Sequence, residues 1–421
     1  MRADLAIVGA GTAGAALASM AAKRGLRVLC LERRAAKEAG ARWVNGVPGW
    51  AFDAAGVARP RGEELFGSGH ELHLLAGFGP RRLAIRGHDV LEVDMRHLVE
   101  RLQNDAREHG ATILEGVRVT GFDGRALDTS AGRVSARWFV DASGLAGARL
   151  LEQPRVGKLD LCSAAQEVRA VTDLAAARAF FDRHEVGAGN TACFTAVAGG
   201  FSVINVRLSG DRVGVLTGSI PGAGQPSGRE LLDRFVAEQP WIGAPLFGGA
   251  RAIPLVRPLD VLARGNVALL GDAAGQVFSA HGSGIGAGMV AARLLADVLG
   301  EGRDLHQYAV AWHRELGGLF ATFEAFRRFS QRLSERDLDR MMQSGLLSEQ
   351  GARAGLEQRL PRPSPGVLAS ALRGVVTERR LALRLAPALA KGAAAAALYR
   401  RYPEDPRALP EWSARLSRLL D

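Results

Sequence analysis

A glycine-rich turn near the N-terminus, Gly9–Gly14, most constrains what this chain can fold into. Residues 4–8 (Asp-Leu-Ala-Ile-Val) have the composition of a short buried strand, and an Ala-rich helical stretch follows the turn. Gly9 permits a tight turn, Gly11 lets the backbone approach a phosphate, and Gly14 lets the helix pack close to the strand. Phosphates would then lie at the helix N-terminus, where free N–H groups and the helix dipole attract anions. The pattern predicts the strand, turn and helix of a dinucleotide-binding fold.

A second expected strand, residues 27–31, leads directly into the acidic residue Glu32. A carboxylate at this place can accept hydrogen bonds from ribose hydroxyls, and it disfavours a 2′-phosphate. A glycine-rich turn alone is weak evidence, because such a turn needs no ligand. Here the strand, the helix and the acid agree, so we expect a bound dinucleotide; segments much further along the chain favour FAD over NAD.

Two later segments have the form of a strand that ends in a turn of small or acidic residues. The first ends in Asp141-Ala-Ser-Gly144, and the second ends in Gly271-Asp272-Ala-Ala-Gly275. Ligands of open α/β sheets bind outside the carboxyl ends of the strands, where both turns would lie. A glycine-rich segment, residues 282–288, and a helix through Leu299 follow the second turn. This is a second helix start that could face a phosphate or a flavin.

In this order, over residues 1–300, the segments resemble the flavoprotein superfamily of p-hydroxybenzoate hydroxylase-type monooxygenases, geranylgeranyl reductases and flavin-dependent halogenases. The resemblance implies FAD, with the acid that matches Asp272 on the ribityl chain and the helix start at 284–288 beside the isoalloxazine and the pyrophosphate. It also implies an arginine at the cofactor within residues 93–102. Met95 stands where that arginine usually lies, so Arg96 matches it only with an offset of one position.

The resemblance and the motifs together give a set of expected site residues. Trp43 and Asn45 fall where the chain of such proteins passes near the isoalloxazine, and we expect them at the substrate. His281 lies beside the flavin-binding glycines and could donate a proton or orient the substrate; a loop histidine that caps the next helix is the alternative. The residues expected at the cofactor are Gly9, Gly11, Thr12, Ala13, Gly14, Glu32, Arg33, Arg42, Arg96, Val119, Asp141, Ala142, Ser143, Gly144, Gly271, Asp272, Gly282, Gly284, Ile285 and Gly286.

The expected fold class is α/β, with a Rossmann-like FAD-binding domain of the glutathione reductase type. Apolar and polar residues alternate on both sides of Ser209-Gly-Asp-Arg212, which predicts a β-hairpin in an inserted antiparallel sheet. That sheet could form the floor of a substrate pocket or simply pack a core. The expected domains are a FAD-binding domain from residues 1–75, 95–155 and 258–300, a substrate domain from 76–94 and 156–257, and a helical C-terminal region, 301–421.

Composition excludes several classes of site. The three cysteines (Cys30, Cys162, Cys193) form no CxxC motif, so neither a disulfide framework nor a structural metal is indicated, and a cytoplasmic location fits best. His70 and His73 lack further metal-ligating residues, and we expect no metal. Basic residues occur as scattered pairs without aromatic interleaving, which argues against nucleic acid as a partner.

The formal net charge of +10 could help to hold a pyrophosphate, an acidic substrate or an anionic membrane surface. Pro387 and Lys391 interrupt the most apolar part of the C-terminal region, so no stretch of transmembrane length is expected. The basic, amphipathic stretch 367–397 could lie on a membrane or cover a lipophilic substrate, but packing on the main body is the more common arrangement. Residues 361–365 are expected to form a stiff connector.

The favoured function is an FAD-dependent monooxygenase that hydroxylates an aromatic or natural-product-like substrate through a flavin hydroperoxide. The alternatives are an ene-reductase of a lipophilic prenyl chain, similar to geranylgeranyl reductases, and a flavoprotein that modifies a peptide or partner protein. Halogenation is disfavoured because no lysine lies between Lys37 and Lys158 and the tryptophan-rich halogenase signature is absent. Without a second GxGxxG motif, electrons would come from transiently bound NAD(P)H or from an external reductase. The substrate, which could be carrier-bound, and the oligomeric state stay open.

Overall fold

The main sheet is built around parallel strands at the N-terminal end of the chain. The computed structural model describes residues 1–145, 147–362 and 364–420. The strand order is β17-β18-β11-β1-β2-β8, and a β9–β10 hairpin extends the sheet from β11. The glycine-rich turn and both later strand-and-turn segments follow strands of this sheet, as predicted. The strand bounds are β1 (Arg2–Val8), β2 (Val28–Leu31), β8 (Thr112–Leu114), β9 (Val119–Phe122), β10 (Ala126–Thr129), β11 (Val134–Asp141), β17 (Ala263–Arg264) and β18 (Val267–Leu269).

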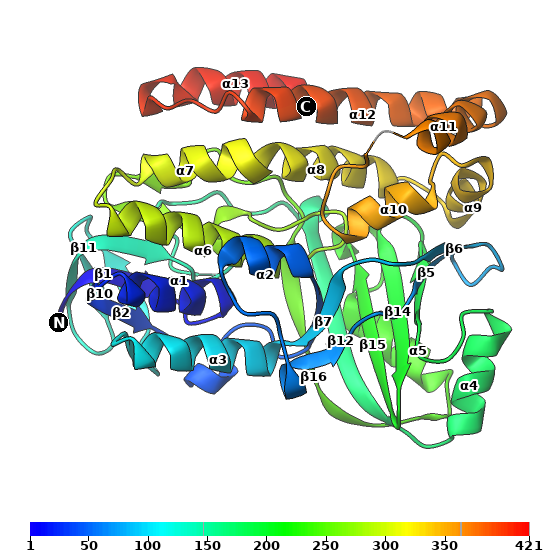
Figure 1. The fold of residues 1–421 in the computed structure, drawn as a ribbon, viewed down its shortest axis with the longest axis horizontal. Helices are drawn as coiled ribbons and strands as arrows, with labels where there is room; N and C mark the ends of the chain where they lie inside the picture. Colours follow the sequence, from blue (N-terminus) through cyan, green and yellow to red (C-terminus); the bar gives the residue numbers. More distant parts are fainter. Residues whose placement is uncertain (146, 363, 421) are drawn as a thin grey trace.

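Three helices pack together against this sheet: α1 (Thr12–Lys23), α3 (Met95–Glu108) and α6 (Ile285–Gly300). Small residues bring α1 and α6 into close contact, since a Cβ added at Gly288 would lie 3.2 Å from the Cβ of Ala13. Their buried apolar residues belong to one large core cluster with α7 and α8. The short α2 (Gly49–Ala55) packs on α6. The two helices that start at the glycine-rich segments are therefore neighbours, although far apart in the sequence (Figure 1).

The second sheet has the order β16-β12-β15-β14-β13-β5-β6 and lies beside the main sheet (Figure 1). The predicted hairpin forms as β14 and β15, which pair from Ser202 with Ser219 to Ser209 with Arg212. α5 (Gly228–Ala237) packs on β12 and β15, and α4 (Leu174–Arg183) adds phenylalanines to the core of this unit. The strand bounds are β5 (Leu72–Ala76), β6 (Arg82–Ile85), β12 (Leu161–Val171), β13 (Thr191–Thr195), β14 (Ser202–Ser209), β15 (Arg212–Ser219) and β16 (Ile242–Pro254).

The second sheet differs in two ways from the antiparallel sheet expected from the sequence. β13 pairs with β5 in parallel, so the sheet is mixed at this place. β7 (Val90–Asp94) belongs to a separate sheet with β3 (Val44–Pro48) and β4 (Leu65–Gly67), rather than joining β5 and β6. Alternation along one segment shows which side chains face inward, but it does not identify the partner strand. The division of the chain into the domains given above stays a prediction.

The C-terminal region is helical, as predicted, and forms layers over α6 (Figure 1). α7 packs on α6 and leads through His313–Gly317 into α8, and α12 packs along α8 with α13 beside it. Pro387 does not end α12, which continues to Tyr399 with the proline exposed. The expected interruption was therefore wrong: α12 is long and apolar enough to cross a membrane by length and composition, a test that core helices also pass. Part of the 361–365 connector, Pro363, lies outside the described residues. The bounds are α7 (His306–Trp312), α8 (Gly318–Ser330), α9 (Glu335–Ser344), α10 (Glu349–Leu356), α11 (Pro365–Thr377), α12 (Arg379–Tyr399) and α13 (Leu409–Leu420).

Candidate cofactor and substrate site

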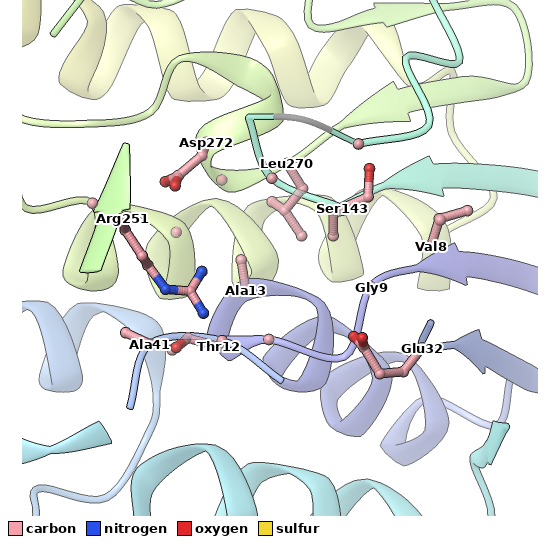
Figure 2. A pocket seen from close by; sticks show the side chains of 18 of the residues that line it. Val8, Gly9, Thr12, Ala13, Glu32, Ala41, Ser143, Arg251, Leu270 and Asp272 are labelled. Atoms are coloured by element: carbon pink, nitrogen blue, oxygen red, sulfur yellow. The ribbon is translucent and has the colours of Figure 1, made fainter. Parts of the chain in front are cut away.

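A long pocket lies where the carboxyl ends of β1, β2 and β11 face strand β16 of the second sheet (Figure 2). The start of α1 and the start of α6 both reach it, so most of its wall comes from the segments that the sequence singles out. Of the expected site residues, the pocket brings together Gly9, Gly11, Thr12, Ala13, Glu32, Arg33, Trp43, Asn45, Val119, Ala142, Ser143, Gly144, Gly271, Asp272, Gly282, Gly284 and Ile285.

The turn before α1 has no room for side chains. Gly9 has a φ of +103°, and a Cβ there would lie 2.5 Å from the carbonyl oxygen of Ala142. A Cβ at Gly14 would lie 1.9 Å from the carbonyl oxygen of Gly9. Gly11 caps α1 without any side-chain hydrogen bond, so the first N–H groups of the helix have no side-chain acceptor at the cap. This turn therefore presents bare backbone donors to the pocket.

Glu32 marks one end of the pocket. Its side chain is 6% exposed, and its two oxygens accept hydrogen bonds from the backbone N–H groups of Ala10 (3.0 Å) and Arg34 (3.1 Å). These bonds fix the carboxylate at the end of β2, and each oxygen keeps a lone pair for a further donor. Ribose hydroxyls are donors of this kind.

The opposite end of the pocket contains Asp272 and the start of α6. Asp272 lies in a short 3-10 turn, Gly271–Ala274, directly after β18, and α6 begins at Gly284 without a side-chain cap. The Asp272 side chain is exposed in the pocket, yet desolvation by the neighbouring protein raises its pKa above the ordinary value, while the charge of Arg251 acts in the opposite direction. A Cβ at Gly284 would lie 2.8 Å from the Gln276 carbonyl oxygen, which explains the glycine. A second uncapped helix start thus faces the pocket.

Arg251, on β16, is a pocket residue that the sequence reasoning missed. Its guanidinium points across the pocket toward Thr12 and Ala13 at the start of α1 (Figure 2). Among the residues that the structure describes, it has no hydrogen-bond or ion-pair partner. Burial lowers its pKa, as does the charge of Arg34, but an arginine stays protonated in proteins. The only sequence signal is an arginine near the end of the predicted substrate domain, two residues before Ile253.

The turn after β11 divides into a structural part and a lining part. Ala142, Ser143 and Gly144 line the pocket, whereas Asp141 is fully buried beneath them. The Asp141 carboxylate accepts hydrogen bonds from the Ser143 N–H (3.1 Å), the Leu150 N–H (3.1 Å) and the Gln153 side chain (3.0 Å). Asp141 therefore holds the shape of the turn on which its neighbours reach the pocket.

Four other expected residues lie outside the set that lines the pocket. Gly14 and Gly286 act through packing, because a Cβ at Gly286 would lie 2.7 Å from the Cβ of Ala51. Arg42 donates to the Lys37 carbonyl. Arg96 pairs with Asp94, two residues away, and lies 3.5 Å from the ring centroid of Phe247. This ion pair engages the guanidinium locally, and a contact of Arg96 with the cofactor stays a prediction.

His281 also lies outside the pocket lining, on the loop between the Asp272 turn and α6. Its ring packs 4.9 Å from that of Phe278 and donates a hydrogen bond to the backbone carbonyl of Gly355 in α10. The side chain is solvent-accessible from a recess, yet surrounding protein lowers its pKa to about 4, so it is neutral at pH 7. It faces the C-terminal helices, and its catalytic role stays a prediction.

The site suits a long, polyanionic dinucleotide. Two uncapped helix starts, one unpaired arginine and one acid at the ribose end are the groups that such a ligand needs. At the Gly282 end the wall turns apolar, since a Cβ there would lie 3.5 Å from Ile253 and 3.7 Å from Leu255. The residues therefore fit FAD.

Comparisons with known proteins agree with this geometry. Residues 7–47 match the model of an NAD(P)-binding Rossmann-like domain. The digeranylgeranylglycerophospholipid reductase 1 of Methanopyrus kandleri is 25% identical over 82% of this chain and 94% of that protein. The digeranylgeranylglycerophospholipid reductase of Sulfolobus acidocaldarius is 23% identical over 99% of this chain and 97% of its own length.

Two solved structures show the same fold. A geranylgeranyl bacteriochlorophyll reductase-like protein from Thermoplasma acidophilum superposes with a TM-score of 0.71, at 17% identity, over 92% of this chain and 99% of that one. PqsL from Pseudomonas aeruginosa, a probable FAD-dependent monooxygenase, has a TM-score of 0.56 at 18% identity, over 85% of this chain and 99% of that one. The chain is therefore an enzyme with the fold of FAD-dependent oxidoreductases, homologous to the digeranylgeranylglycerophospholipid reductases.

Proposed function

We propose that this protein is an FAD-dependent reductase of carbon–carbon double bonds in a lipophilic, isoprenoid-type substrate. The observation that carries the proposal is full-length homology: the relation to the Sulfolobus reductase extends over 99% of this chain and 97% of that protein, so it includes the C-terminal helices as well as the cofactor domain. The likeness to PqsL is one of fold alone. The sequence alone favoured a monooxygenase, and the homology reverses that order.

This chain has Met95 where the related flavoproteins usually have an arginine at the cofactor. In this proposal Arg251 supplies that positive charge instead. The pyrophosphate of FAD would lie between the start of α1 and the Arg251 guanidinium, and Glu32 would hold the adenosine ribose. Asp272 would accept from the ribityl chain. When bound and reduced, FAD supplies two electrons for the double bond, which also takes up two protons.

The chain's own residues would then position the substrate and exclude water. Near Gly282 the pocket is lined by Ile253, whereas Leu255 and Phe278 are fully buried close by, and Phe278 packs on Phe320 and Phe323. Ile253 gives this end of the pocket an apolar contact, and the buried apolar side chains beside it exclude water from that side, which suits an isoprenoid chain. The apolar wall supports the reductase proposal but would also accept an aromatic ring.

The experiment that separates the two chemistries uses the purified protein reconstituted with FAD. Reduced under anaerobic conditions with dithionite and mixed with a geranylgeranyl lipid, the protein should yield a product that has gained two hydrogen atoms per double bond. The monooxygenase is the second candidate because PqsL shares the fold. It predicts no anaerobic product and a gain of one oxygen atom in air with an aromatic substrate.

A further inference from the structure

The outermost helices carry an apolar surface that the protein leaves uncovered. We call it the α11–α12 face and define it by Leu368, Leu372, Val375 and Val376 on α11 and by Leu383 and Leu389 on α12. Leu372 is 67% exposed, Val376 is 66% exposed and Leu383 is 73% exposed, which is unusual for such large apolar side chains. The α11 members are spaced by four, three and one residues, so they form one continuous stripe along that helix.

The opposite side of α12 is firmly attached to the protein. Leu381 and Leu385 are buried, and a Cβ at Gly392 would lie 2.9 Å from Thr322 of α8. α12 therefore packs on the protein through one side, while its other side remains exposed. A helix held in this way cannot cross a bilayer without breaking its contacts with α8, so the α11–α12 face can only lie along a surface.

The charges on α11 and α12 themselves are almost all positive. Arg373 on α11 and Arg379 and Arg380 at the start of α12 have no carboxylate partner among the residues that the structure describes. Glu378 is the only acidic residue between positions 358 and 403 of the sequence. Exposed leucines and valines bordered by unpaired arginines have the composition of helices that lie in the interface of anionic membranes.

We propose that the α11–α12 face docks this protein onto the surface of an anionic lipid bilayer. The apolar stripe would insert at the level of the headgroups, and the three arginines would contact lipid phosphates. A second copy of this chain is a poorer occupant, because each copy has a formal net charge of +10 and would bring the same arginines against one another. The proposal does not depend on the reaction that the protein catalyses, although a surface of this kind would give access to a membrane lipid.

The test is co-sedimentation of the full-length, FAD-loaded protein with vesicles, which requires no turnover. One set of vesicles contains phosphatidylcholine alone and the other contains phosphatidylcholine with phosphatidylglycerol. Two double variants probe the face: Leu368→Gln with Leu372→Gln, and Arg379→Gln with Arg380→Gln. Matched controls change exposed residues elsewhere, Leu174→Gln with Leu246→Gln and Arg178→Gln with Arg183→Gln.

The wild type and both control variants should sediment with the anionic vesicles and remain in solution with the neutral ones. The arginine variant lacks two arginines and should bind about thirtyfold more weakly, because each arginine near such a surface contributes on the order of 1 kcal/mol. The leucine variant should lose at least about as much, since each leucine buries apolar surface. A wild type that stays in solution with anionic vesicles, or variants of the face that bind like their controls, would overturn the proposal. So would a dimer in sedimentation equilibrium that only the leucine variant abolishes.

Discussion

Arg251 offers the sharpest single test of how the pocket holds its cofactor. Its guanidinium projects into the pocket from β16, toward the start of α1, and it has no ion-pair partner among the described residues. Arg251→Gln keeps a polar side chain of moderate length and removes the charge. We expect the variant to bind FAD less tightly, because a pyrophosphate placed at α1 would lose its cation on the opposite wall.

The magnitude follows from the kind of bond that is lost. Hydrogen bonds to charged groups contribute about 1.5–3 kcal/mol each, and about 1.4 kcal/mol corresponds to a tenfold change in Kd. The substitution should therefore raise the Kd for FAD by about 10- to 100-fold, since a full Coulomb gain is reduced by the cost of desolvating both groups. Riboflavin, which has no phosphate, should lose little affinity.

The assay is titration of the apoprotein with FAD and with riboflavin, followed by the change in flavin fluorescence. Arg178→Gln, on the surface of α4, serves as the control. The apoprotein adds a second readout: Arg251 is exposed and has no partner among the described residues, so the substitution should leave the Tm of the free protein unchanged. Equal Kd values for FAD in variant and wild type would refute the reasoning, as would an equal loss for riboflavin.

Three further predictions concern other parts of the protein. Gly14→Ala should cost about 3 kcal/mol in urea unfolding, the upper end of the cost of overpacking, because its Cβ would lie 1.9 Å from the Gly9 carbonyl oxygen. Gly366→Ala, where the space is open, should cost little, and equal losses would contradict the packing argument. Glu32→Gln should weaken FAD binding about tenfold through the loss of a charged acceptor, as measured by the same fluorescence titration, and an unchanged Kd would show that Glu32 does not contact the ligand. His313 is fully buried, and this burial lowers its pKa to about 3, whereas the unfolded chain protonates near the ordinary value of 6.5. Stability should therefore be fully present above pH 6.5 and fall as the pH drops toward 3, by about 1.4 kcal/mol per unit for this residue. Urea unfolding of His313→Phe should show a shallower acid loss than wild type; parallel curves would exclude this residue as the cause.

Local features of the site could be predicted from the sequence because neighbouring residues determine them. The turn at Gly9, the acid at Glu32 and the start of α6 each depend on a strand and a helix that are adjacent in the chain. The same reasoning predicted Arg96 at the cofactor from its position in a motif. A motif shows only where a residue lies along the chain. It cannot show that Asp94, two residues earlier, already binds the guanidinium.

Long-range features could not be predicted. Arg251 reaches the pocket only because β16 of the second sheet lies across from α1, and no local motif surrounds it. The pairing of β7 with β3 and β4 likewise depends on strands that are distant in sequence. For the C-terminal helices, the apolar spacing predicted helices that pack on the main body. α12 does so through one side, but spacing alone could not show that the stripe on α11 has no covering element.

The central claim, reduction of an isoprenoid double bond, is tested most directly by single turnover without oxygen. The FAD-loaded protein, reduced with a measured amount of dithionite, is mixed with a geranylgeranyl phospholipid in anionic vesicles, and the lipid is analysed by mass spectrometry. The reductase proposal predicts reoxidised flavin and a lipid that has gained two hydrogen atoms for each pair of electrons. Flavin that stays reduced beside unchanged lipid, but forms an oxygenated aromatic product once air is admitted, would contradict it.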